Sequence, residues 1–319
     1  MDNVYVLMAT YNGDKYITEQ INSILSQTYE NWILLVRDDI SSDRTLDILK
    51  KYERKDARIR IIKATKRLGI RENFNYLLEY ALNENAKYIM FADQDDVWLN
   101  DKIEVSLREM KKAESNDGLP VMVYGNYEFV DENLQHLSYA NRENGFCGLN
   151  RNNTLFIQNS ILGATMMINR KLGECVVKIP DVVDYHDRWI SLLATTCGSV
   201  VYLNSVVEKH RIHDNNATQN VRTDSLKSKL ARLKIFIRDH DAYWRNLTEL
   251  YEQLLLRIEE HDLSPNKTLL SKYEVLLNKR GFTGVIFIIK NKFFMIKKKQ
   301  TLWLLVAMLI KRYKRYNDI

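Results

Sequence analysis

The sequence predicts an α/β protein: a parallel, doubly wound sheet in its first part and a helical extension behind it. Short apolar runs alternate with segments that carry apolar residues at helical spacing, and from Asp224 the pattern becomes continuously helical. Strands that are joined by helices of this length imply right-handed crossovers and parallel pairing. We therefore expect an α/β domain over 1–222 and a helical extension over 223–319.

The expected elements of the first half follow from this alternation. Apolar runs predict strands at 4–9, 32–36, 59–62 and 88–91, and helical spacing predicts a helix after each of the first three. The helical positions are Ile17, Ile21, Ile24 and Leu25, then Leu46, Leu49 and Tyr52, then Phe74, Leu77, Leu78, Ala81 and Leu82. Beyond residue 120 the pattern predicts a mixed or antiparallel extension, with strands at 121–130, 161–168, 200–203 and 206–212 and a short helix at 189–194.

The C-terminal part predicts one long helix followed by shorter ones. From Leu226 to Ile258, apolar residues alternate four-three spacing, which is a heptad seam interrupted in polarity only by His240. The seam could pack within the chain or against a second copy, so a homodimer stays open. Ser264 and Pro265 predict the start of the next helix, and Gly281 lies just past its end.

Composition excludes several classes of protein. The 319 residues are 45% hydrophobic and 28% charged, which is typical of a globular protein. Three widely spaced cysteines argue against a disulfide framework and a zinc site, and they suit a reducing cytosol. No signal peptide is visible near residue 4. The net charge of +6 belongs to the C-terminal tail.

An acidic cluster follows the fourth predicted strand. Asp93, Asp95 and Asp96 lie within four residues, at the carboxyl end of a strand where open α/β sheets bind ligands. Carboxylates this close repel one another unless a cation lies among them, and their oxygens favour Mg²⁺ or Mn²⁺. The plain structural alternative is a solvated acidic turn before the helix that begins near Asp101.

Two other strand ends carry polar turns. Ala9, Thr10 and Tyr11 precede an Asn-Gly turn, where a nucleotide base could lie against Tyr11. Asp38 and Asp39 follow the second strand, and a carboxylate there could accept the imide N–H of uracil or thymine. Neither turn is a Gly-x-Gly-x-x-Gly or Walker loop, so dinucleotide dehydrogenases and P-loop enzymes lose support.

These segments together resemble a known family. Ala-Thr-Tyr-Asn-Gly, then Asp-Asp-x-Ser-x-Asp-x-Thr, then Asp-Gln-Asp-Asp-Val-Trp resemble the family 2 inverting glycosyltransferases with the nucleotide-diphospho-sugar-binding (GT-A) fold. With Arg71-Glu72-Asn73-Phe74-Asn75, the run is most similar to bacterial rhamnosyltransferases of polysaccharide assembly. The resemblance spans roughly residues 3 to 220.

The resemblance implies roles for individual residues. Tyr11 and Asp39 would hold the base, and Ala9 and Thr10 would belong to the same nucleotide-sugar site. Asp95 would hold the ribose or metal, with Asp93 and Asp96 as alternative ligands. The sequence departs from the family pattern at Ile40, where Gly is usual, and at Glu72, where Arg is usual. Neighbouring Arg71 is the candidate for the diphosphate contact.

Further roles are implied later in the chain. Asp187, in His186-Asp187-Arg188-Trp189, resembles the family's catalytic base, although an Asp there could simply complement a helix dipole. Arg211 would neutralise diphosphate charge. His213 would be a metal ligand, or else a plain surface histidine. The chain lacks the Gln-x-x-Arg-Trp signature of processive polymerases, which favours single addition.

The basic tail predicts a helix lying in a membrane interface. Residues 281–299 and 301–315 alternate apolar runs with Lys and Arg, and the apolar run from Thr301 to Ile310 is half the length that spans a bilayer. A helix docked on the protein is the alternative. The apolar content argues against nucleic acid as a partner.

The predicted function is therefore metal-dependent transfer of a sugar with inversion, with Mg²⁺ or Mn²⁺ as cofactor. The expected donor is dTDP-rhamnose, or another nucleotide sugar such as a UDP-hexose. The expected acceptor is a lipid-linked glycan or polysaccharide at the cytoplasmic face of the cell membrane. A catalytically silent scaffold of a glycan-assembly complex is the rival, suggested by the heptad seam.

Overall fold

The computed structural model describes residues 2–114, 118–137, 151–159, 161–213, 226–295 and 298–310. Its backbone divides into two compact units, of which the first comprises residues 1–145 and 161–213 and the second comprises 146–160 and 214–319. The helix α5 (Arg151–Ile157) thus groups with the C-terminal helices. The predicted domain division at 222/223 stays a prediction.

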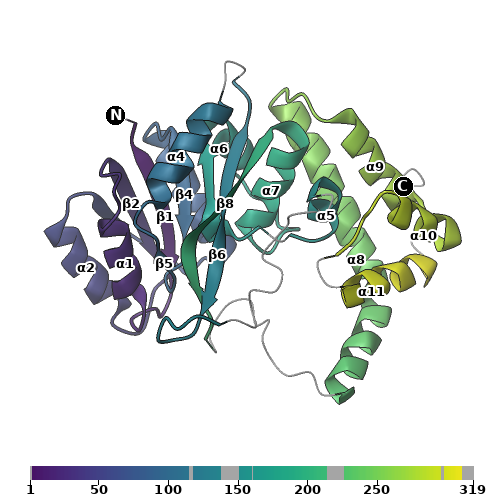
Figure 1. Ribbon diagram of the computed structural model, residues 1–319, viewed down its shortest axis with the longest axis horizontal. Coiled ribbons are helices and arrows are strands. Elements are labelled where there is room, and N and C mark those ends of the chain that lie inside the picture. The colour runs from purple at the N-terminus through teal and green to yellow at the C-terminus, as the bar shows by residue number, and fades with distance from the viewer. Residues whose placement is uncertain are drawn as a thin grey trace. The chain divides into compact units, whose positions relative to one another are not determined.

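The first unit holds an eight-stranded sheet among the described residues, in the order β3-β2-β1-β4-β7-β6-β8-β5 (Figure 1). Its strands are β1 (Val4–Thr10), β2 (Trp32–Asp38), β3 (Ile59–Ile62), β4 (Tyr88–Ala92), β5 (Val97–Trp98), β6 (Val121–Val130), β7 (Met166–Asn169) and β8 (Ser199–Arg211). The first four in this order pair in parallel, as predicted.

The second part of the sheet is mixed, because β7 runs antiparallel to both β4 and β6 while β6 and β8 are parallel. The strand predicted over 161–168 is wrong in its first half, where a 3₁₀ turn, η2 (Gly163–Thr165), precedes β7. The two strands predicted over 200–212 are one, β8, which accommodates register shifts against β6 on either side of Asn126.

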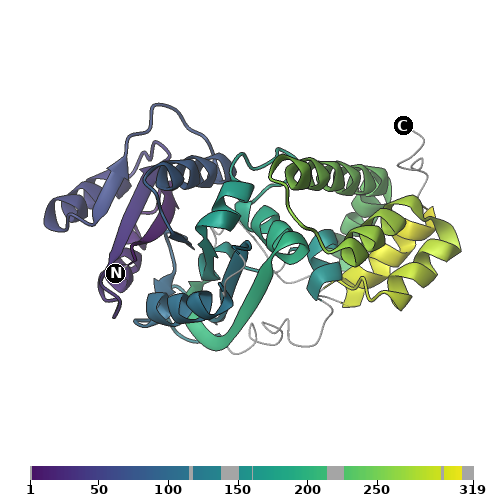
Figure 2. The same cartoon turned by 90° about the horizontal axis from the view of Figure 1, so that it is seen from above.

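Helices cover both faces of the sheet in the first unit (Figures 1 and 2). These helices are α1 (Ile17–Leu25), α2 (Thr45–Lys55), α3 (Ile70–Asn83), α4 (Lys102–Ala113), α6 (Arg170–Val176) and α7 (His186–Cys197). Successive side chains of a strand point to opposite faces, so β1 needs apolar residues on both and has them from Val4 to Ala9. In α1, α2 and α3 apolar residues recur at helical spacing, because one face of each helix packs on the sheet, and this spacing predicted the three helices.

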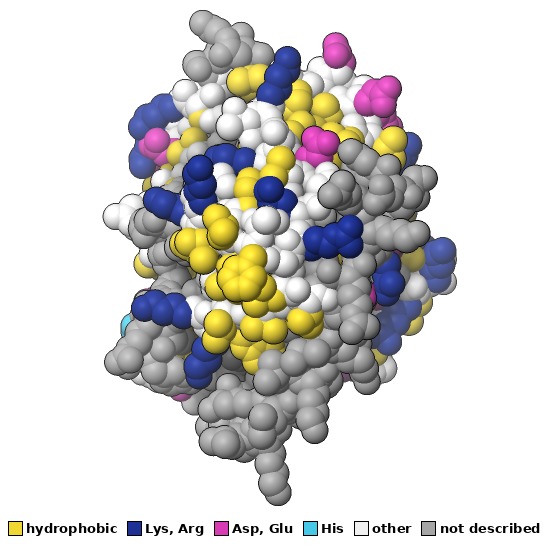
Figure 3. All heavy atoms as spheres, turned by 90° about the vertical axis from the view of Figure 1, so that its right-hand side faces the viewer, with side chains coloured by type: hydrophobic (Ala, Val, Ile, Leu, Met, Phe, Trp, Pro, Cys, Tyr) yellow, Lys and Arg dark blue, Asp and Glu magenta, His cyan; other side chains and the backbone are white. Residues whose placement is uncertain are grey.

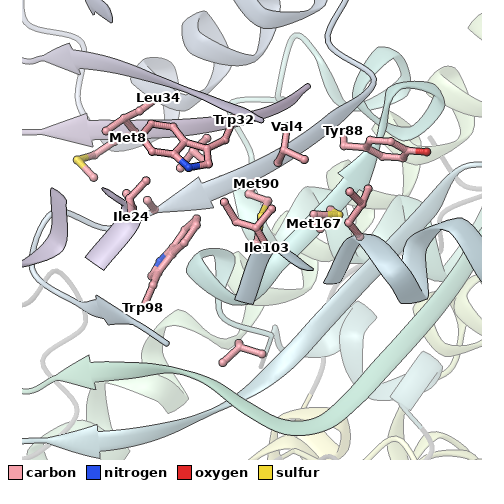
Figure 4. Packing of buried hydrophobic residues seen from close by; sticks show 14 of the residues in the cluster. Val4, Met8, Ile24, Trp32, Leu34, Tyr88, Met90, Trp98, Ile103 and Met167 are labelled. Carbon is pink, nitrogen blue, oxygen red and sulfur yellow. The ribbon is translucent and has the colours of Figure 1, made fainter. Parts of the chain in front are cut away.

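The core between the sheet and α1, α2 and α4 is closely packed (Figure 4). Val4 and Met8 of β1, Trp32 of β2, Met90 of β4 and Ile24 of α1 belong to this one cluster of apolar residues, and each is at most 1% exposed. Burying one such side chain stabilises the fold by about 1.5–3 kcal/mol. This core holds the carboxyl ends of β1, β2 and β4 in register.

The second unit is helical. Besides α5 it contains α8 (Leu226–Glu260), α9 (Lys267–Asn278), α10 (Gly281–Lys290) and α11 (Lys298–Ile310). Of the predicted seam residues whose side chains the structure describes, Trp244, Leu247, Tyr251 and Leu254 are buried and Ile258 is half-buried. The cap of α9 differs from the prediction: Asn266, not Ser264, caps it, because its side chain accepts from the Leu269 amide. Within the described residues, no helix combines the length and apolar content needed to cross a membrane.

Gly198, between α7 and β8, tests how closely these elements approach. A Cβ atom there would lie 2.1 Å from the Pro120 carbonyl oxygen, which accepts from the Ser199 amide. Gly198→Ala should lower the free energy of unfolding by about 1–3 kcal/mol, since backbone must move. Urea denaturation measures it, with Ser199→Ala as the control that stays near wild type. An unchanged midpoint for Gly198→Ala would contradict the packing described.

Candidate nucleotide-sugar and metal site

The carboxyl ends of β1, β2 and β4 form one edge, where the predicted residues gather. The Thr10 hydroxyl donates to Asp38 Oδ1 over 3.1 Å, and the Asp39 amide donates to the Thr10 carbonyl over 2.7 Å. Because the strands are parallel, their polar ends come together at one side of the sheet. Ala9, Thr10 and Asp39 therefore lie side by side, as predicted for a ligand-binding edge.

Gln94 joins the turn after β1 to the acidic segment after β4. Its side-chain oxygen accepts from the Tyr11 amide (2.9 Å), and its side-chain nitrogen donates to the Tyr11 carbonyl (3.1 Å). A Cβ at Gly13 would lie 2.3 Å from the same Gln94 oxygen, so a larger residue there would displace the Gln94 side chain from its contact with Tyr11. Sequence reasoning gave Gln94 no role; its position between acids was the available signal.

Asp39 is buried and stays ionised. Its carboxylate accepts from the amides of Leu68 (2.7 Å) and Gly69 (2.8 Å) and from Arg37 (3.2 Å). Burial raises the pKa of this group, but these hydrogen bonds outweigh it and hold the pKa below its usual value. Asp39 thus orders the loop before α3.

Ile40, where the family pattern has glycine, adopts φ +63°, a left-handed conformation that glycine takes without strain. The backbone shape of this turn therefore matches the family pattern even though the residue does not. Nearby, the Arg67 guanidinium lies 3.7 Å from the centre of the Tyr11 ring, and Tyr11 is 37% exposed. The guanidinium therefore covers one face of the Tyr11 ring, and a nucleobase that stacked on that face would have to displace it.

The acidic cluster after β4 lies against the end of β8. Asp96 is fully buried and accepts from His210 Nδ1 (3.0 Å) and the Arg211 amide (2.9 Å), and Asp95 Oδ2 lies 2.9 Å from His213 Nε2. His213 therefore lies opposite the acids, and its role as a metal ligand stays a prediction. Sequence reasoning assigned no role to His210, whose only signal was its position three residues before His213.

Charge in this cluster is strongly coupled. Burial and the neighbouring Asp96 and Asp95 raise the pKa of Asp93 well above its usual value. For His210, burial opposes the charged form, but Asp96, Glu208 and Asp93 together raise its pKa to about 10. The cluster thus binds positive charge, here as an imidazolium.

Ligand atoms of Asp93, Asp96 and His210 lie within 4.8 Å of one another. An octahedral Mg²⁺ with bonds of about 2.1 Å separates opposite ligands by roughly 4.2 Å, so the spacing of this donor set fits such an ion after a small contraction. His210 would have to lose its proton before it could bind the metal, because an imidazolium has no free lone pair. Carboxylate oxygens and imidazole nitrogens also suit Mn²⁺. Asp95 and His213 form a second oxygen–nitrogen pair beside this group.

Arg211 binds the backbone of the acidic segment through a buried side chain. Its side chain is fully buried, donates to the Asp95 carbonyl (2.8 Å) and the Glu132 carbonyl (2.5 Å), and pairs with Glu19. It therefore fixes the backbone on which Asp95 stands. The diphosphate contact implied for Arg211 stays a prediction.

Arg71 holds the segment that leads into α7. It pairs with Glu72 and Asp181 and donates to the carbonyls of Pro180 and Val183, both at 3.4 Å. Its implied diphosphate contact stays a prediction. In the described conformation its hydrogen bonds restrain the loop that precedes Asp187.

Asp187 is partly exposed in the first turn of α7, and its neighbour His186 is buried. The centroid of the His186 ring lies 4.0 Å from that of the Phe74 ring and 4.8 Å from that of the Phe91 ring. Phe91 lies two residues before Asp93. A Cβ at Gly163 would lie 2.6 Å from the His186 ring, so η2 also presses on this turn. These contacts bring the start of α7 to the end of β4.

Comparisons with known proteins agree with this geometry. A family profile for glycosyl transferase family 2 matches residues 5–175. The chain belongs to glycosyltransferase family 2. This confirms the resemblance inferred from the motifs.

Similar curated proteins act on different sugars. The chain is 29% identical over 228 residues to the putative teichuronic acid biosynthesis glycosyltransferase TuaG of Bacillus subtilis, covering 68% of this chain and 82% of that one. It is 37% identical over 130 residues to the UDP-Glc:alpha-D-GlcNAc-diphosphoundecaprenol beta-1,3-glucosyltransferase WfgD of Escherichia coli, covering 41% of this chain and 47% of that one. It is 38% identical over 99 residues to the dTDP-rhamnosyl transferase RfbG of Shigella flexneri, covering 30% and 34%.

Solved structures agree on the fold. S. aureus TarS 1-349 in complex with UDP-GlcNAc superposes with a TM-score of 0.58 at 15% identity, covering 96% of this chain and 79% of that one. Mannosyltransferase PcManGT from Pyrobaculum calidifontis, in complex with GDP-Man and Mn²⁺, has a TM-score of 0.50 at 14% identity, covering 97% and 86%. The predicted GT-A fold is thereby confirmed.

His186 makes the fold sensitive to acid. Burial lowers the pKa of His186 from 6.5 to about 3. The stabilisation that depends on a neutral imidazole is therefore complete above pH 6.5 and is lost as the pH falls from 6.5 toward 3. At pH 5 protonation should cost about 2 kcal/mol of the free energy of unfolding. His186→Leu should remove this loss between pH 7 and pH 5 in urea denaturation, whereas exposed His136→Leu should keep it. Equal pH dependence in wild type and His186→Leu would contradict the assignment.

A buried ion pair joins helix α4 to strand β8. Lys102 and Glu208 are fully buried and paired, and Lys102 also donates to the Ala164 carbonyl of η2 over 2.7 Å. Lys102→Met should cost about 3–5 kcal/mol of the free energy of unfolding, because Glu208 is left as an uncompensated charge. The double variant Lys102→Met/Glu208→Leu should recover most of it.

The control for this cycle lies on the same helix. Lys111→Met removes an exposed lysine that pairs with Asp2 and should stay within about 0.5 kcal/mol of wild type. Urea midpoints of the wild type, Lys102→Met, Glu208→Leu and the double variant measure the coupling. A double variant as unstable as the two single changes summed would show that the pair does not act as a unit.

Proposed function

We propose that this chain is a metal-dependent inverting glycosyltransferase of cell-surface glycan synthesis. The observation that carries the proposal is the meeting of the acids after β4 with the imidazoles at the end of β8, at the edge where the base-binding candidates of β1 and β2 lie. Asp93, Asp95 and Asp96 converge at this edge, and such carboxylates are suited to a divalent cation that carries a diphosphate.

The proposed ligands for the metal are Asp93, Asp95 and His213, with Asp96 as the alternative carboxylate. Asp96 is already satisfied by His210 and the Arg211 amide, so its first role is to hold the end of β8 against β4. Bound Mg²⁺ or Mn²⁺ would offset negative charge on the diphosphate as it leaves. Tyr11 and Asp39 would hold the base.

Asp187 is proposed as the general base. The acceptor hydroxyl attacks the anomeric carbon and gives its proton to the Asp187 carboxylate, while the bond from that carbon to the diphosphate oxygen breaks. Displacement from the opposite side inverts the configuration, and a nucleoside diphosphate leaves. The helix N-terminus favours the ionised carboxylate, which is the form that can accept a proton.

We propose dTDP-rhamnose as donor, with a UDP-hexose as the alternative. The sequence motifs and the partial similarity to a dTDP-rhamnosyl transferase support rhamnose, and the similarity to a UDP-Glc-dependent enzyme supports the alternative. Asp39 suits either nucleotide, because uracil and thymine share the imide N–H. A panel of nucleotide sugars with Mn²⁺ separates them by thermal stabilisation.

The proposed acceptor is a glycan on a lipid carrier, reached from the cytoplasmic face of the cell membrane. Support comes from the printed acceptor of the E. coli relative, a diphosphoundecaprenol, although the match spans about half of that protein. The basic C-terminal helices fit a peripheral position at such a surface.

The residue assignments are tested by activity. Asp187→Asn should lower kcat by about 100- to 10,000-fold with donor affinity retained, because the base is lost but not the donor site. Asp184→Asn, three residues earlier and exposed, is the matched control and should keep wild-type rates. Release of nucleoside diphosphate in the presence of acceptor measures both.

Asp95→Ala should instead abolish the Mn²⁺-dependent stabilisation by nucleoside diphosphate. Wild-type rates for Asp187→Asn or unchanged stabilisation for Asp95→Ala would remove that residue from its role. Donor turnover that is absent with and without Mn²⁺ in the wild type would favour the scaffold.

A further inference from the structure

Helix α10 has two different faces. Gly284 and Ile288 are buried, and a Cβ at Gly284 would lie 2.3 Å from Met308 Sδ of α11. The glycine therefore allows α10 and α11 to pack closely. This face is satisfied by packing within the second unit.

The other face of α10 is apolar and exposed. Phe282, Ile286 and Ile289 recur at i, i+4 and i+7 and are 77%, 60% and 52% exposed. Leu302 of α11 adds a fourth apolar side chain, 60% exposed. Large side chains gathered like this on one helix face are unusual unless something covers them. We call Phe282, Ile286 and Ile289 the outer face of α10.

Positive charge borders the outer face. Arg280, Lys290 and Lys292 are exposed at its two ends. From residue 279 to residue 310 the sequence has no Asp or Glu, while it has Lys279, Arg280, Lys290, Lys292, Lys297, Lys298 and Lys299. Figure 3 views the side on which Figure 1 shows α9 and α10, and apolar side chains gather there with Lys and Arg around them.

We propose that the outer face of α10 docks on an anionic lipid surface, with the helix lying along the surface. The three apolar side chains enter the headgroup region, and the surrounding Lys and Arg contact lipid phosphates. Ten residues of helix span about 15 Å, half of a bilayer core, so α10 lies in the interface and does not cross it.

A second copy of this chain fits the outer face less well. Pairing two copies through it would bring two rims of Lys and Arg together with no acidic residue between 279 and 310 to offset them. Anionic lipid supplies the missing opposite charge. The inference deepens the proposed function, since a lipid-linked acceptor would lie at the same surface, but its test does not depend on glycosyl transfer.

Co-sedimentation of the full chain with vesicles tests the inference. Wild type should bind vesicles of phosphatidylcholine with about 30% phosphatidylglycerol at least tenfold more tightly than vesicles of phosphatidylcholine alone. Added salt should weaken this binding, because it screens the attraction between Lys or Arg and the lipid phosphates. Phe282→Ser/Ile286→Ser/Ile289→Ser should lose at least tenfold in the partition coefficient. Lys290→Glu/Lys292→Glu should lose a similar factor on the anionic vesicles only.

Matched controls lie in the first unit. Leu119→Ser removes an apolar side chain that is 43% exposed, and Lys50→Glu/Lys51→Glu reverses two exposed lysines of α2; both should bind as wild type does. Circular dichroism checks that the variants are folded. A triple variant that partitions like wild type overturns the proposal. So does a wild-type dimer that the triple variant converts to monomer without any vesicle binding, which would assign the face to a second copy.

Discussion

The ionic contact between the acids after β4 and the basic end of β8 is the interaction on which the site depends. Repulsion among Asp93, Asp95 and Asp96 would open this edge of the sheet if nothing opposed it. His210 and Arg211 bind Asp96 from β8, more than a hundred residues away in the chain. The same contact therefore joins the segment after β4 to the end of β8 and concentrates cation-binding groups at the ends of the strands.

Around this contact, the structure restrains the side chains that chemistry would use. Gln94 ties the acidic segment to the turn after β1, and Lys102 ties α4 to Glu208 and to η2. Turn η2 presses on the start of α7, where Asp187 stands beside His186. Buried polar pairs of this kind add little net stability, but they leave few alternative arrangements for the groups they hold.

The second unit consists of helices, and in α10 one face is buried against neighbouring helices while another is exposed. In α10 the buried face is made by Gly284 and Ile288 and the exposed face by larger apolar residues. A bundle that needed only internal packing would carry polar residues on the outside. The apolar outer face and its basic border are therefore the features that packing within the chain does not explain.

The sequence by itself determined the strands β1–β4, the helices between them and the family. Periodicity predicted β3 and β6 with the bounds that the structure has, because backbone preference and side-chain alternation are local properties. Three short motifs identified family 2. Only the tertiary structure decided that Gln94 bridges two turns, that His210 faces Asp96, that η2 replaces half of a strand, and that Arg211 is buried. Each of these depends on a partner distant in the chain, and no local pattern records which distant group will satisfy a buried charge or hydrogen bond.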